Sequence, residues 1–323
     1  MESVSMDEVD RGLLHAFQLD GRAPFSKIAE VLGVSERTIA RRYQRLRTSG
    51  VLRVVGTVDG ARLGYHSWTI RLQCTPDAAG SVAAALARRA DTFWVHLLSG
   101  GTEISCTTQT PTPEERDALL LQKLPRTHRV VSVTAHSMLH VFAKPIGWAA
   151  LSSLSPEQAE KLRPPTPAQA DDEPPVLTEA DEALLDVLSR DGRATYAELS
   201  AVTRWSESTV KRRMDQLRHS GVLSYMIDIP PEVLGYRAEA RLWMSVAPSD
   251  LVSVANTLAQ HPEVSFAAVT TGSTNLMAAV ICRDTRDLYR YLTERIPVLD
   301  AVRHLETAPV IRTVKRAGAV LPI

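Results

Sequence analysis

Two nineteen-residue stretches combine cationic side chains with small hydroxyl side chains at the spacing of a single helix. The first is VSERTIARRYQRLRTSGVL, from Val34 to Leu52, and the second is WSESTVKRRMDQLRHSGVL, from Trp205 to Leu223. Guanidinium and ammonium groups neutralise phosphates and donate hydrogen bonds to base edges, and hydroxyl groups contact phosphate oxygens. These residue types therefore indicate nucleic-acid binding, unless each stretch is an ordinary solvated helix.

Each stretch divides into two faces when its residues are placed at about 100° intervals. The apolar face holds Ile39, Tyr43 and Leu46 in the first stretch, and Val210, Met214 and Leu217 in the second. The opposite face is polar and contains Arg37, Arg41, Gln44 and Thr48 in the first stretch, and Ser208 and Arg212, with Lys211 nearby, in the second. A basic outer face alone is more often a solvated surface than a DNA reader, so the neighbouring elements decide between the two.

Those neighbouring elements predict a helix-turn-helix. Apolar residues at helical spacing predict two short helices before the first stretch, and Gly33 then breaks the second of them, where Arg204 stands in the repeat. Ser35 and Ser206 are expected as N-caps, which leave amide groups directed outward at a positive helix end and so suit a phosphate. In a helix-turn-helix the last helix enters the major groove. The predicted DNA-binding residues are Ser35, Arg37, Thr38, Arg41, Arg42, Arg45, Ser206, Ser208, Thr209, Lys211, Arg212 and Arg213.

The chain contains an internal duplication. A shift of 171 residues aligns Asp10–Tyr65 with Asp181–Tyr236 without a gap, and 22 of the 56 positions are identical, including the motifs DGRA, SGVL and LGY. A shift of 172 continues the similarity more weakly toward the C-terminus. Between the copies, residues 152–177 contain six prolines and predict a partly extended linker.

After the LGY triplet, the pattern changes to runs typical of strands, alternating with helical runs. The order in the first copy is βαββαβ, and the second copy repeats it from Arg237 to Arg316, which predicts ferredoxin-like modules. The expected fold is α+β, with two winged-type helix-turn-helix domains and two βαββαβ modules in tandem. The expected domains are 1–60 and 178–231 for the helix-turn-helix pair, 61–150 and 232–323 for the modules, and 151–177 for the linker.

Composition narrows the classes of function. Lys plus Arg and Asp plus Glu both number 37, so a nucleic-acid surface has to be local. Three scattered cysteines, Cys74, Cys106 and Cys282, argue against disulfides and zinc ribbons. His128, His136 and His140 lack matching Cys or carboxylate neighbours, so neither a metal nor a cofactor is expected. The sequence has no secretory signal and no membrane-length apolar run, which predicts a cytoplasmic, nucleoid-associated protein with no membrane partner.

The two cationic stretches, each preceded by a helix pair containing DGRA and followed by a βαββαβ module, resemble the Lrp/AsnC transcriptional regulators. The resemblance covers nearly the whole chain apart from the linker. It implies a helix-turn-helix joined by a β-hinge to an amino-acid-sensing module that dimerises through its sheet. Family members usually carry one copy, so two copies in one chain predict an internal pseudo-dimer, with further self-association of the sheets also open.

The resemblance also implies where a small-molecule effector binds. The family typically has a G-x-Y-D turn between the second and third strands of the module, and the matching stretches here are GGTE and GSTN, which lack the Tyr-Asp pair. The alternative is that both are plain glycine turns between strands. The expected effector residues are Gly100, Gly101, Thr102, Glu103, Gly272, Ser273, Thr274 and Asn275.

The predicted function is that of a sequence-specific transcriptional regulator that binds double-stranded DNA and responds to an amino acid or a related metabolite. It is not expected to be an enzyme. Siroheme decarboxylases resemble the same regulators in fold and can occur as fused pairs, so a tetrapyrrole enzyme is the alternative. A further alternative is a regulator whose second helix-turn-helix serves only dimerisation. The persistence of outward cationic residues in both copies favours DNA binding.

Overall fold

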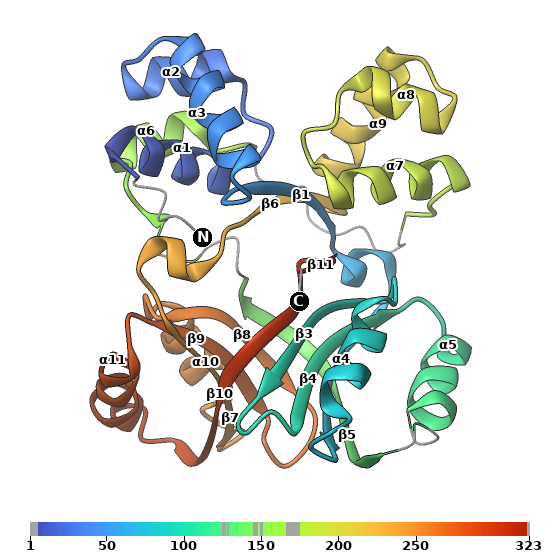
Figure 1. Cartoon of the computed structure of the whole chain (residues 1–323), viewed down its shortest axis with the longest axis vertical. Coiled ribbons are helices and arrows are strands. Elements are labelled where there is room, and N and C mark those ends of the chain that lie inside the picture. The colour runs from blue at the N-terminus through green and yellow to red at the C-terminus, as the bar shows by residue number, and fades with distance from the viewer. Residues whose placement is uncertain are drawn as a thin grey trace. The chain divides into compact units, whose positions relative to one another are not determined.

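The structure, a computed structural model, describes residues 6–124, 127, 129–144, 148, 151–165 and 175–321. The chain divides into two compact units (Figure 1). The first unit comprises Met1–Gly64 and Leu151–Val233 and contains both helix-turn-helix copies. The second comprises Tyr65–Ala150 and Leu234–Ile323 and contains both βαββαβ modules. Like parts of the duplicated chain are thus grouped together.

Each helix-turn-helix copy consists of three helices. They are α1 (Glu8–Leu19), α2 (Phe25–Leu32) and α3 (Glu36–Thr48) in the first copy, and α7 (Glu179–Arg190), α8 (Tyr196–Thr203) and α9 (Glu207–His219) in the second. The predicted apolar residues of α3 and α9 are buried, so each helix presents its polar face outward. The turn before each of these helices needs a left-handed residue. Gly33 supplies it at φ 66°, whereas Arg204 adopts it at φ 60° without the freedom of glycine.

The strand after each helix-turn-helix pairs with the other copy. Strand β1 (Arg53–Val58) runs antiparallel to β6 (Leu223–Asp228), and the Arg53 guanidinium lies 2.8 Å from the Asp228 carboxylate at the end of the ladder. A 3-10 turn follows each strand, at Gly60–Leu63 and at Pro231–Leu234. The β-hinge that the family resemblance implies therefore links the two copies, because the backbone groups of each strand form hydrogen bonds with the strand of the other copy.

The two DGRA motifs hold the copies together through their arginines. Arg22 Nη1 donates to the carbonyl oxygens of Gly192 and Ala194 at 2.9 and 3.0 Å. Arg193 Nη1 makes the equivalent contacts in return, at 2.8 and 3.2 Å, with the carbonyl oxygens of Gly21 and Ala23. Charged donors to buried carbonyls form strong hydrogen bonds. We call this reciprocal pair, Arg22 and Arg193, the arginine interlock.

Ion pairs and aromatic rings surround the arginine interlock. Arg47 of α3 pairs with Asp191 at 2.7 Å, and Arg218 of α9 pairs with Asp20 at 3.1 Å, so these contacts are also reciprocal. The Arg193 guanidinium lies 4.6 to 5.4 Å from the centres of three rings of the first copy, those of Phe17, Phe25 and Tyr43. Cation–π attraction stabilises a buried guanidinium in such a site. Helices α3 and α9 thus belong to one connected unit.

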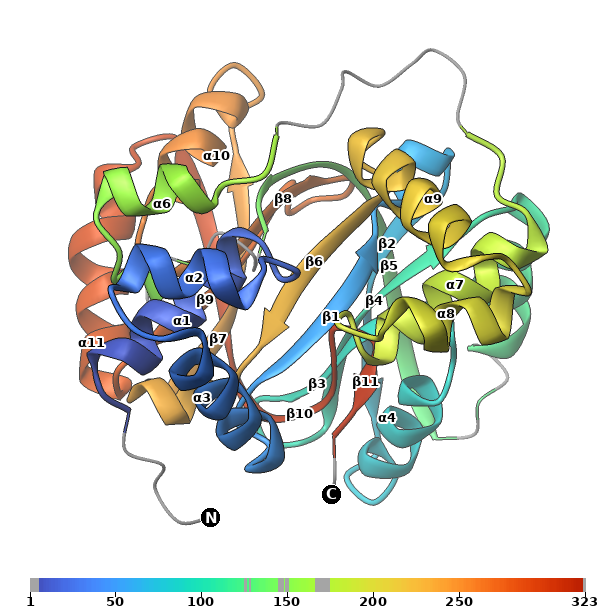
Figure 2. The ribbon, with the colours of Figure 1, turned by 90° about the horizontal axis from the view of Figure 1, so that it is seen from above.

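The stretch expected to be a partly extended linker contains a helix, α6 (Pro156–Leu162), that packs on α1 and α2 (Figure 2). Ser155 and Gln158 form its capping box, and the Gln158 side chain also donates to the Val31 carbonyl at 2.9 Å. His15 Nδ1 accepts from the backbone amides of residues 153 and 154 at 3.1 and 2.9 Å. This part is therefore folded rather than extended, because a local capping signal outweighs the proline content. Residues 166–174 lie outside the described residues.

The His15 contact predicts that α6 docks less firmly in acid. Nδ1 accepts hydrogen bonds only when unprotonated, and burial holds the pKa of His15 below its ordinary value. The unfolded state therefore binds more protons than the folded state as the pH falls below about 6.5, and stability declines by at most about 1.4 kcal/mol per pH unit for this group.

The check on His15 is hydrogen exchange of residues 151–162 between pH 7.5 and pH 5, corrected for the intrinsic exchange rate. Acid should increase exchange in the wild type. It should do so less in His15→Asn, because the amide oxygen replaces the acceptor without titrating. The exposed His66→Asn serves as control. An equal acid response in the wild type and His15→Asn would contradict the prediction.

The second unit repeats one order of elements. The first module consists of β2 (His66–Cys74), α4 (Ala79–Ala87), β3 (Thr92–Leu98), β4 (Glu103–Thr110), α5 (Pro113–Asp117) with the turn Ala118–Lys123, and β5 (Val130–Ala143). The second consists of β7 (Ala238–Val246), α10 (Leu251–Ala259), β8 (Val264–Thr270), β9 (Leu276–Cys282), α11 (Thr285–Arg290) with turns over Tyr291–Arg295 and Ile296–Val298, and β10 (Val302–Arg316) with β11 (Ala319–Val320). The predicted βαββαβ order is confirmed in both copies.

The two modules share one antiparallel sheet within the described part of the chain. Its order is β11-β10-β3-β4-β2-β5-β8-β9-β7, and a further pairing of β10 with β7 closes the ladder. The long strands make the connection: β5 pairs first with β2 and then with β8, and β10 pairs first with β7 and then with β3. The modules therefore form the pseudo-dimer that the duplication predicts.

Three apolar cores form among the described residues of this unit. One lies under α4, one lies under α10 and α11, and a smaller one, with Leu98, Trp243 and Met277, joins the modules. The three cysteines are buried and unpaired, as expected of small strand residues. Burial raises the pKa of Cys106 to about 12, so it stays a thiol at neutral pH.

Candidate nucleic-acid interface

The outward face of α3 carries two unpaired cations. The side chains of Arg37 and Arg41 are exposed, and neither forms a hydrogen bond or an ion pair with any described residue. Gln44 and Thr48 are exposed on the same face. Arg37, Arg41 and Gln44 can donate to phosphates and base edges without first breaking a side-chain contact. The Thr48 hydroxyl, by contrast, already donates to the Gln44 carbonyl at 2.8 Å.

Serine caps begin both reading helices. Ser35 Oγ accepts from the Thr38 amide at 3.1 Å, and Ser206 Oγ accepts from the Thr209 amide at 3.3 Å. The predicted N-caps are therefore confirmed. Ser208 lies 2.9 Å from the Ser206 hydroxyl and extends this cluster. Hydroxyls and free amides at a helix N-terminus suit an anion such as phosphate.

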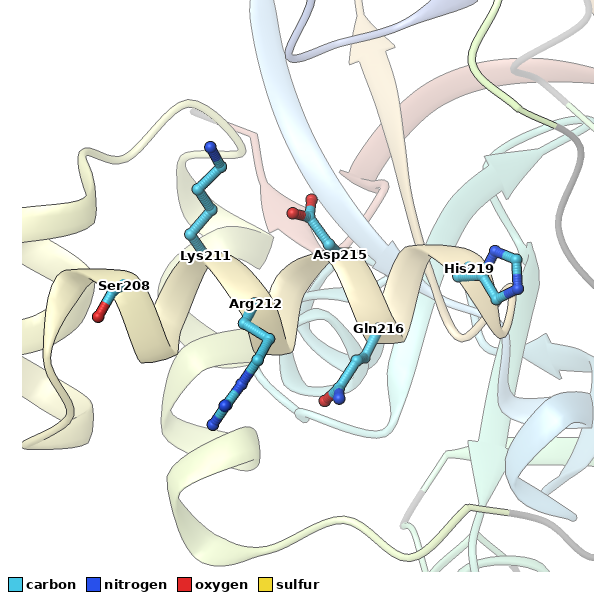
Figure 3. A pocket seen from close by; sticks show the side chains of 6 residues that line it. All are labelled: Ser208, Lys211, Arg212, Asp215, Gln216 and His219. Atoms are coloured by element: carbon cyan, nitrogen blue, oxygen red, sulfur yellow. The ribbon is translucent and has the colours of Figure 1, made fainter.

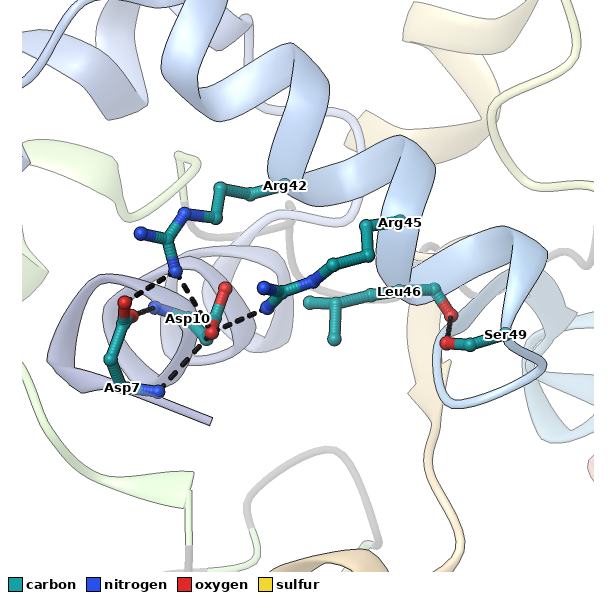
Figure 4. A network of polar contacts seen from close by, with 6 residues as sticks. All are labelled: Asp7, Asp10, Arg42, Arg45, Leu46 and Ser49. Atoms are coloured by element: carbon teal, nitrogen blue, oxygen red, sulfur yellow. Dashed lines mark hydrogen bonds and ion pairs between the residues drawn. The ribbon is translucent and has the colours of Figure 1, made fainter. Parts of the chain in front are cut away.

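Two of the predicted DNA-binding arginines of α3 have internal partners (Figure 4). Arg42 lies 2.5 Å from Asp7 and 3.0 Å from Asp10, and Arg45 lies 2.6 Å from Asp10, whose side chain is almost fully buried. These hydrogen bonds raise the pKa of Arg42 above its ordinary value. The pairs attach α3 to the N-terminus of α1, where a carboxylate is favoured. Arg42 and Arg45 are therefore left out of the DNA contacts proposed below.

The second copy repeats this attachment at Arg213. Its Nε and Nη2 lie 2.6 and 2.8 Å from the two carboxylate oxygens of the buried Asp181. Burial alone would raise the pKa of Asp181, but hydrogen bonds from Arg213 and Thr178 outweigh it and hold the pKa below its ordinary value. Arg213 is likewise left out of the proposed contacts. Sequence reasoning missed this role, although the identity of Asp10 and Asp181 under the repeat was a usable signal.

The outward face of α9 differs from that of α3. Its exposed side chains line a shallow hollow along the helix (Figure 3): Ser208, Lys211, Arg212, Asp215, Gln216 and His219. Lys211 and Asp215 point to one side of the helix in this view, and Arg212 and Gln216 to the other. A carboxylate therefore stands among the cations of α9, at the position that Gln44 occupies in α3.

The first predicted effector turn joins β3 to β4. Ser99 and Gly101 adopt left-handed conformations at φ 53° and 79°, and a Cβ at Gly100 or Gly101 would meet no atom within 4 Å. Glu103 is buried and accepts from Arg71 Nε at 2.7 Å. Arg71 also forms a bidentate pair with Glu306 of the other module, at 2.5 and 2.8 Å.

The Arg71 cluster joins the two modules with charged groups. The Arg71 guanidinium lies 3.8 Å from the centre of the Trp243 ring, and it carries one positive charge between two carboxylates. The hydrogen bond from Arg71 holds the pKa of Glu306 below its ordinary value. The cluster therefore has an excess of one negative charge beside the first turn, a setting that favours a cationic group.

The polar groups of the second turn contact neighbouring strands. Asn275 Oδ1 accepts from the Val246 amide and its Nδ2 donates to the Val246 carbonyl, both at 2.9 Å. The Thr274 carbonyl accepts from the Thr270 hydroxyl at 3.1 Å. Gly272 has a φ of 105°, and a Cβ there would clash with the His136 ring. An effector at this turn would have to displace the contacts of Asn275.

Other candidate chemistry has no support in the described residues. They contain no cluster of three or more His, Cys, Asp or Glu side chains with metal-binding geometry. His136 packs over Gly272, His140 lies against Phe142, and His128 falls outside the described residues. None of the described helices combines the length and apolar character that a bilayer-spanning helix requires.

These features define a helix-turn-helix protein with paired ferredoxin-like modules, and family comparisons agree. Residues 6–47 and 177–218 match the AsnC-type helix-turn-helix domain, and residues 239–320 match the Lrp/AsnC ligand binding domain. The chain belongs to the Lrp/AsnC family.

Curated relatives correspond to one copy of the duplication. An uncharacterized HTH-type transcriptional regulator of Pyrococcus abyssi is 33% identical over 143 residues, which cover 44% of this chain and 90% of the relative. The HTH-type transcriptional regulator FL11 of Pyrococcus horikoshii is 32% identical over 46% of this chain and 97% of its own length. The regulator LrpA of Pyrococcus abyssi is 28% identical over 43% of this chain and its full length.

The match to solved structures extends over nearly the whole chain in the following case. The siroheme decarboxylase NirDL is 18% identical and superposes with a TM-score of 0.66 over 96% of this chain and 93% of its own. At this identity the likeness extends to the fold. The arrangement of four domains in one chain therefore occurs in a solved protein.

Proposed function

We propose that this protein is a sequence-specific DNA-binding transcriptional regulator. The main support for this proposal is the outward face of α3. Arg37 and Arg41 are exposed there and have no partner among the described residues, whereas the neighbouring Arg42 and Arg45 pair with carboxylates. A helix with a merely solvated outer face would not need unpaired arginines on that face beside arginines that form ion pairs. Major-groove recognition needs free donors on a helix held rigidly from behind.

The proposed operator is bipartite and asymmetric. The arginine interlock and the β1–β6 ladder hold α3 and α9 in one unit, so both helices are presented together. Their outward residues differ, because Arg37, Ala40 and Gln44 correspond to Ser208, Lys211 and Asp215. Half-sites of such a pair lie about one helical turn, roughly 34–36 Å, or a multiple of it apart. Asp215 lowers the attraction of α9 for phosphate, so α3 contributes the larger share of affinity.

The experiment that tests the proposal is selection of DNA fragments by the purified chain, followed by a mobility shift with the recovered sequence. The expected result is a recovered bipartite motif whose halves differ, bound at least about a thousandfold more tightly than scrambled DNA at physiological salt. Recovery of no motif, or binding that a scrambled sequence matches, would show that the protein is not a sequence-specific regulator.

The proposed effector is a small molecule with an ammonium group, such as an amino acid, bound near Gly100–Glu103. The open space at the glycines and the excess negative charge of the Arg71 cluster support this turn over Gly272–Asn275, where the His136 ring crowds Gly272 and Asn275 carries no charge. Coupling between effector and DNA is typically about 1–3 kcal/mol.

We expect Glu103→Gln to weaken the effector about tenfold or more, because a charge-assisted hydrogen bond is worth roughly 1.5–3 kcal/mol. The measurement is calorimetry with a ligand found in a thermal-shift screen of amino acids. The exposed Glu232→Gln is the matched control. A screen without any binder, or equal affinity in both variants, would leave the turn with a structural role only.

The tetrapyrrole enzyme is the alternative that the fold leaves open. Titration of the protein with an iron porphyrin carrying carboxylate side chains, followed by absorbance, separates the two classes. We expect no shift of the Soret band at protein concentrations that saturate the operator. A saturable shift together with absent operator binding would favour the enzyme.

A further inference from the structure

Asp215 places a carboxylate, which is not a general DNA contact, on the outward face of α9. Its side chain is exposed at the centre of the outward face of α9, between Ser208, Lys211, Arg212 and His219 (Figure 3). Among the described residues it forms no hydrogen bond or ion pair. Its carboxylate can only accept hydrogen bonds, and phosphate repels it.

The first unit gives Asp215 little freedom to avoid DNA. Strand β6 follows α9 directly and pairs with β1, and Arg218 of α9 itself pairs with Asp20 of the first copy. The arginine interlock adds four hydrogen bonds between the copies. If α3 enters a major groove, α9 is therefore held close to the same duplex, with the carboxylate of Asp215 on its outward face.

Major-groove chemistry limits which base can face a carboxylate. Guanine presents two acceptors there, and these repel a carboxylate. Thymine presents an acceptor and a methyl group, and neither of them can donate a hydrogen bond to it. Adenine presents a donor next to an acceptor, which repels the second carboxylate oxygen. Cytosine presents its amino group without a neighbouring acceptor on the same base. The carboxylate therefore selects cytosine by rejecting the alternatives.

The equivalent position of the first copy has the opposite preference. Gln44 is exposed on α3, and its amide has both a donor and an acceptor, the pattern that pairs with adenine in a bidentate fashion. Resting on the proposed regulator function, we propose that Asp215 reads a cytosine in the second half-site where Gln44 reads an adenine in the first. This single difference makes the two half-sites distinguishable and fixes the direction in which the protein lies on DNA.

The experiment is selection from a random DNA pool with the wild type and with Asp215→Gln, the change that gives α9 the side chain of α3. The wild type should recover cytosine at one position of the second half-site, and the variant should recover adenine there. Affinity of the variant for the cytosine site should fall about tenfold or more, and it should rise for the adenine-substituted site.

Controls separate base reading from charge. Asp300→Asn removes an exposed carboxylate from the second unit and should leave the recovered bases and the affinities unchanged. If Asp215→Gln raises affinity for all sequences equally, or leaves the recovered bases as they are, Asp215 does not read a base and this inference is overturned. If the wild type recovers no motif at all, the proposed regulator function fails as well.

Discussion

Replacing Arg37 and Arg41 together by alanine should lower affinity for the operator about 30-fold or more. Each arginine is exposed and unpaired in the described structure, so its loss removes a DNA contact without breaking an internal one. A base-reading arginine is worth about 1–3 kcal/mol, and two such contacts add when they touch separate positions. If either contacts phosphate instead, the slope of log affinity against log salt should become shallower by about 0.9 for each lost contact.

The measurement is a mobility shift or fluorescence anisotropy titration at several salt concentrations. The matched control is Arg88→Ala with Arg286→Ala, which removes the same charge from exposed positions of the second unit. Arg42→Ala is unsuitable as a test of DNA contact, because it breaks the pairs with Asp7 and Asp10. Operator affinity within twofold of the wild type in the Arg37, Arg41 double variant, with the helical content intact, would contradict the prediction.

Replacing Arg193 by alanine should lower the free energy of unfolding of the first unit by about 3 kcal/mol. The substitution removes two charged hydrogen bonds to carbonyls and the packing of the guanidinium among three aromatic rings. Charged hydrogen bonds contribute roughly 1.5–3 kcal/mol, and a desolvated cation–π contact adds up to about 2. Burial holds the pKa of Arg193 below its ordinary value, and part of the gain is therefore spent on desolvation.

Denaturant unfolding followed by far-UV circular dichroism provides the measurement, with separate fits if the two units unfold apart. Arg190→Ala is the matched control, because Arg190 forms an exposed pair with Asp186 within one helix. It should cost less than about 0.5 kcal/mol. A double-mutant cycle of Arg22 with Arg193 should show coupling, since each donates to the motif of the other. Equal stability of Arg193→Ala and the control would argue against the arginine interlock.

The order of elements was within reach of the sequence for a physical reason. Helical and alternating apolar spacings are local, and the duplication supplied each pattern twice, so an ambiguous run in one copy was settled by the other. The buried faces of α3 and α9 and the serine caps followed from the same spacing. The helix α6 was not predicted, because the six prolines indicated an extended segment and the capping box of Ser155 and Gln158 is a short signal.

The side-chain contacts between residues far apart in the chain could not be predicted from the sequence. The shared DGRA motif was visible as an identity, but only the fold brings Arg22 to the Ala194 carbonyl, 172 residues away. Arg42 and Arg45 look like DNA contacts on a helical wheel, yet their flank position puts them beside Asp10. Likewise, nothing in the composition of the β4 turn indicates that Glu103 shares Arg71 with Glu306 of the other module. Side-chain pairs between distant elements depend on packing that no periodicity encodes.

The strand exchange between the modules has a consequence for how this protein behaves at low copy number. A regulator built from two separate chains loses its second half on dilution, and its active fraction then falls faster than its concentration. Here β5 of the first module pairs with β8 of the second, and β10 of the second pairs with β3 of the first. Because both modules belong to one polypeptide, each stays at a high effective concentration for the other. Operator occupancy should therefore follow the number of chains in direct proportion. One chain suffices where a homodimer needs two copies, and the two halves can diverge in sequence while they stay covalently joined.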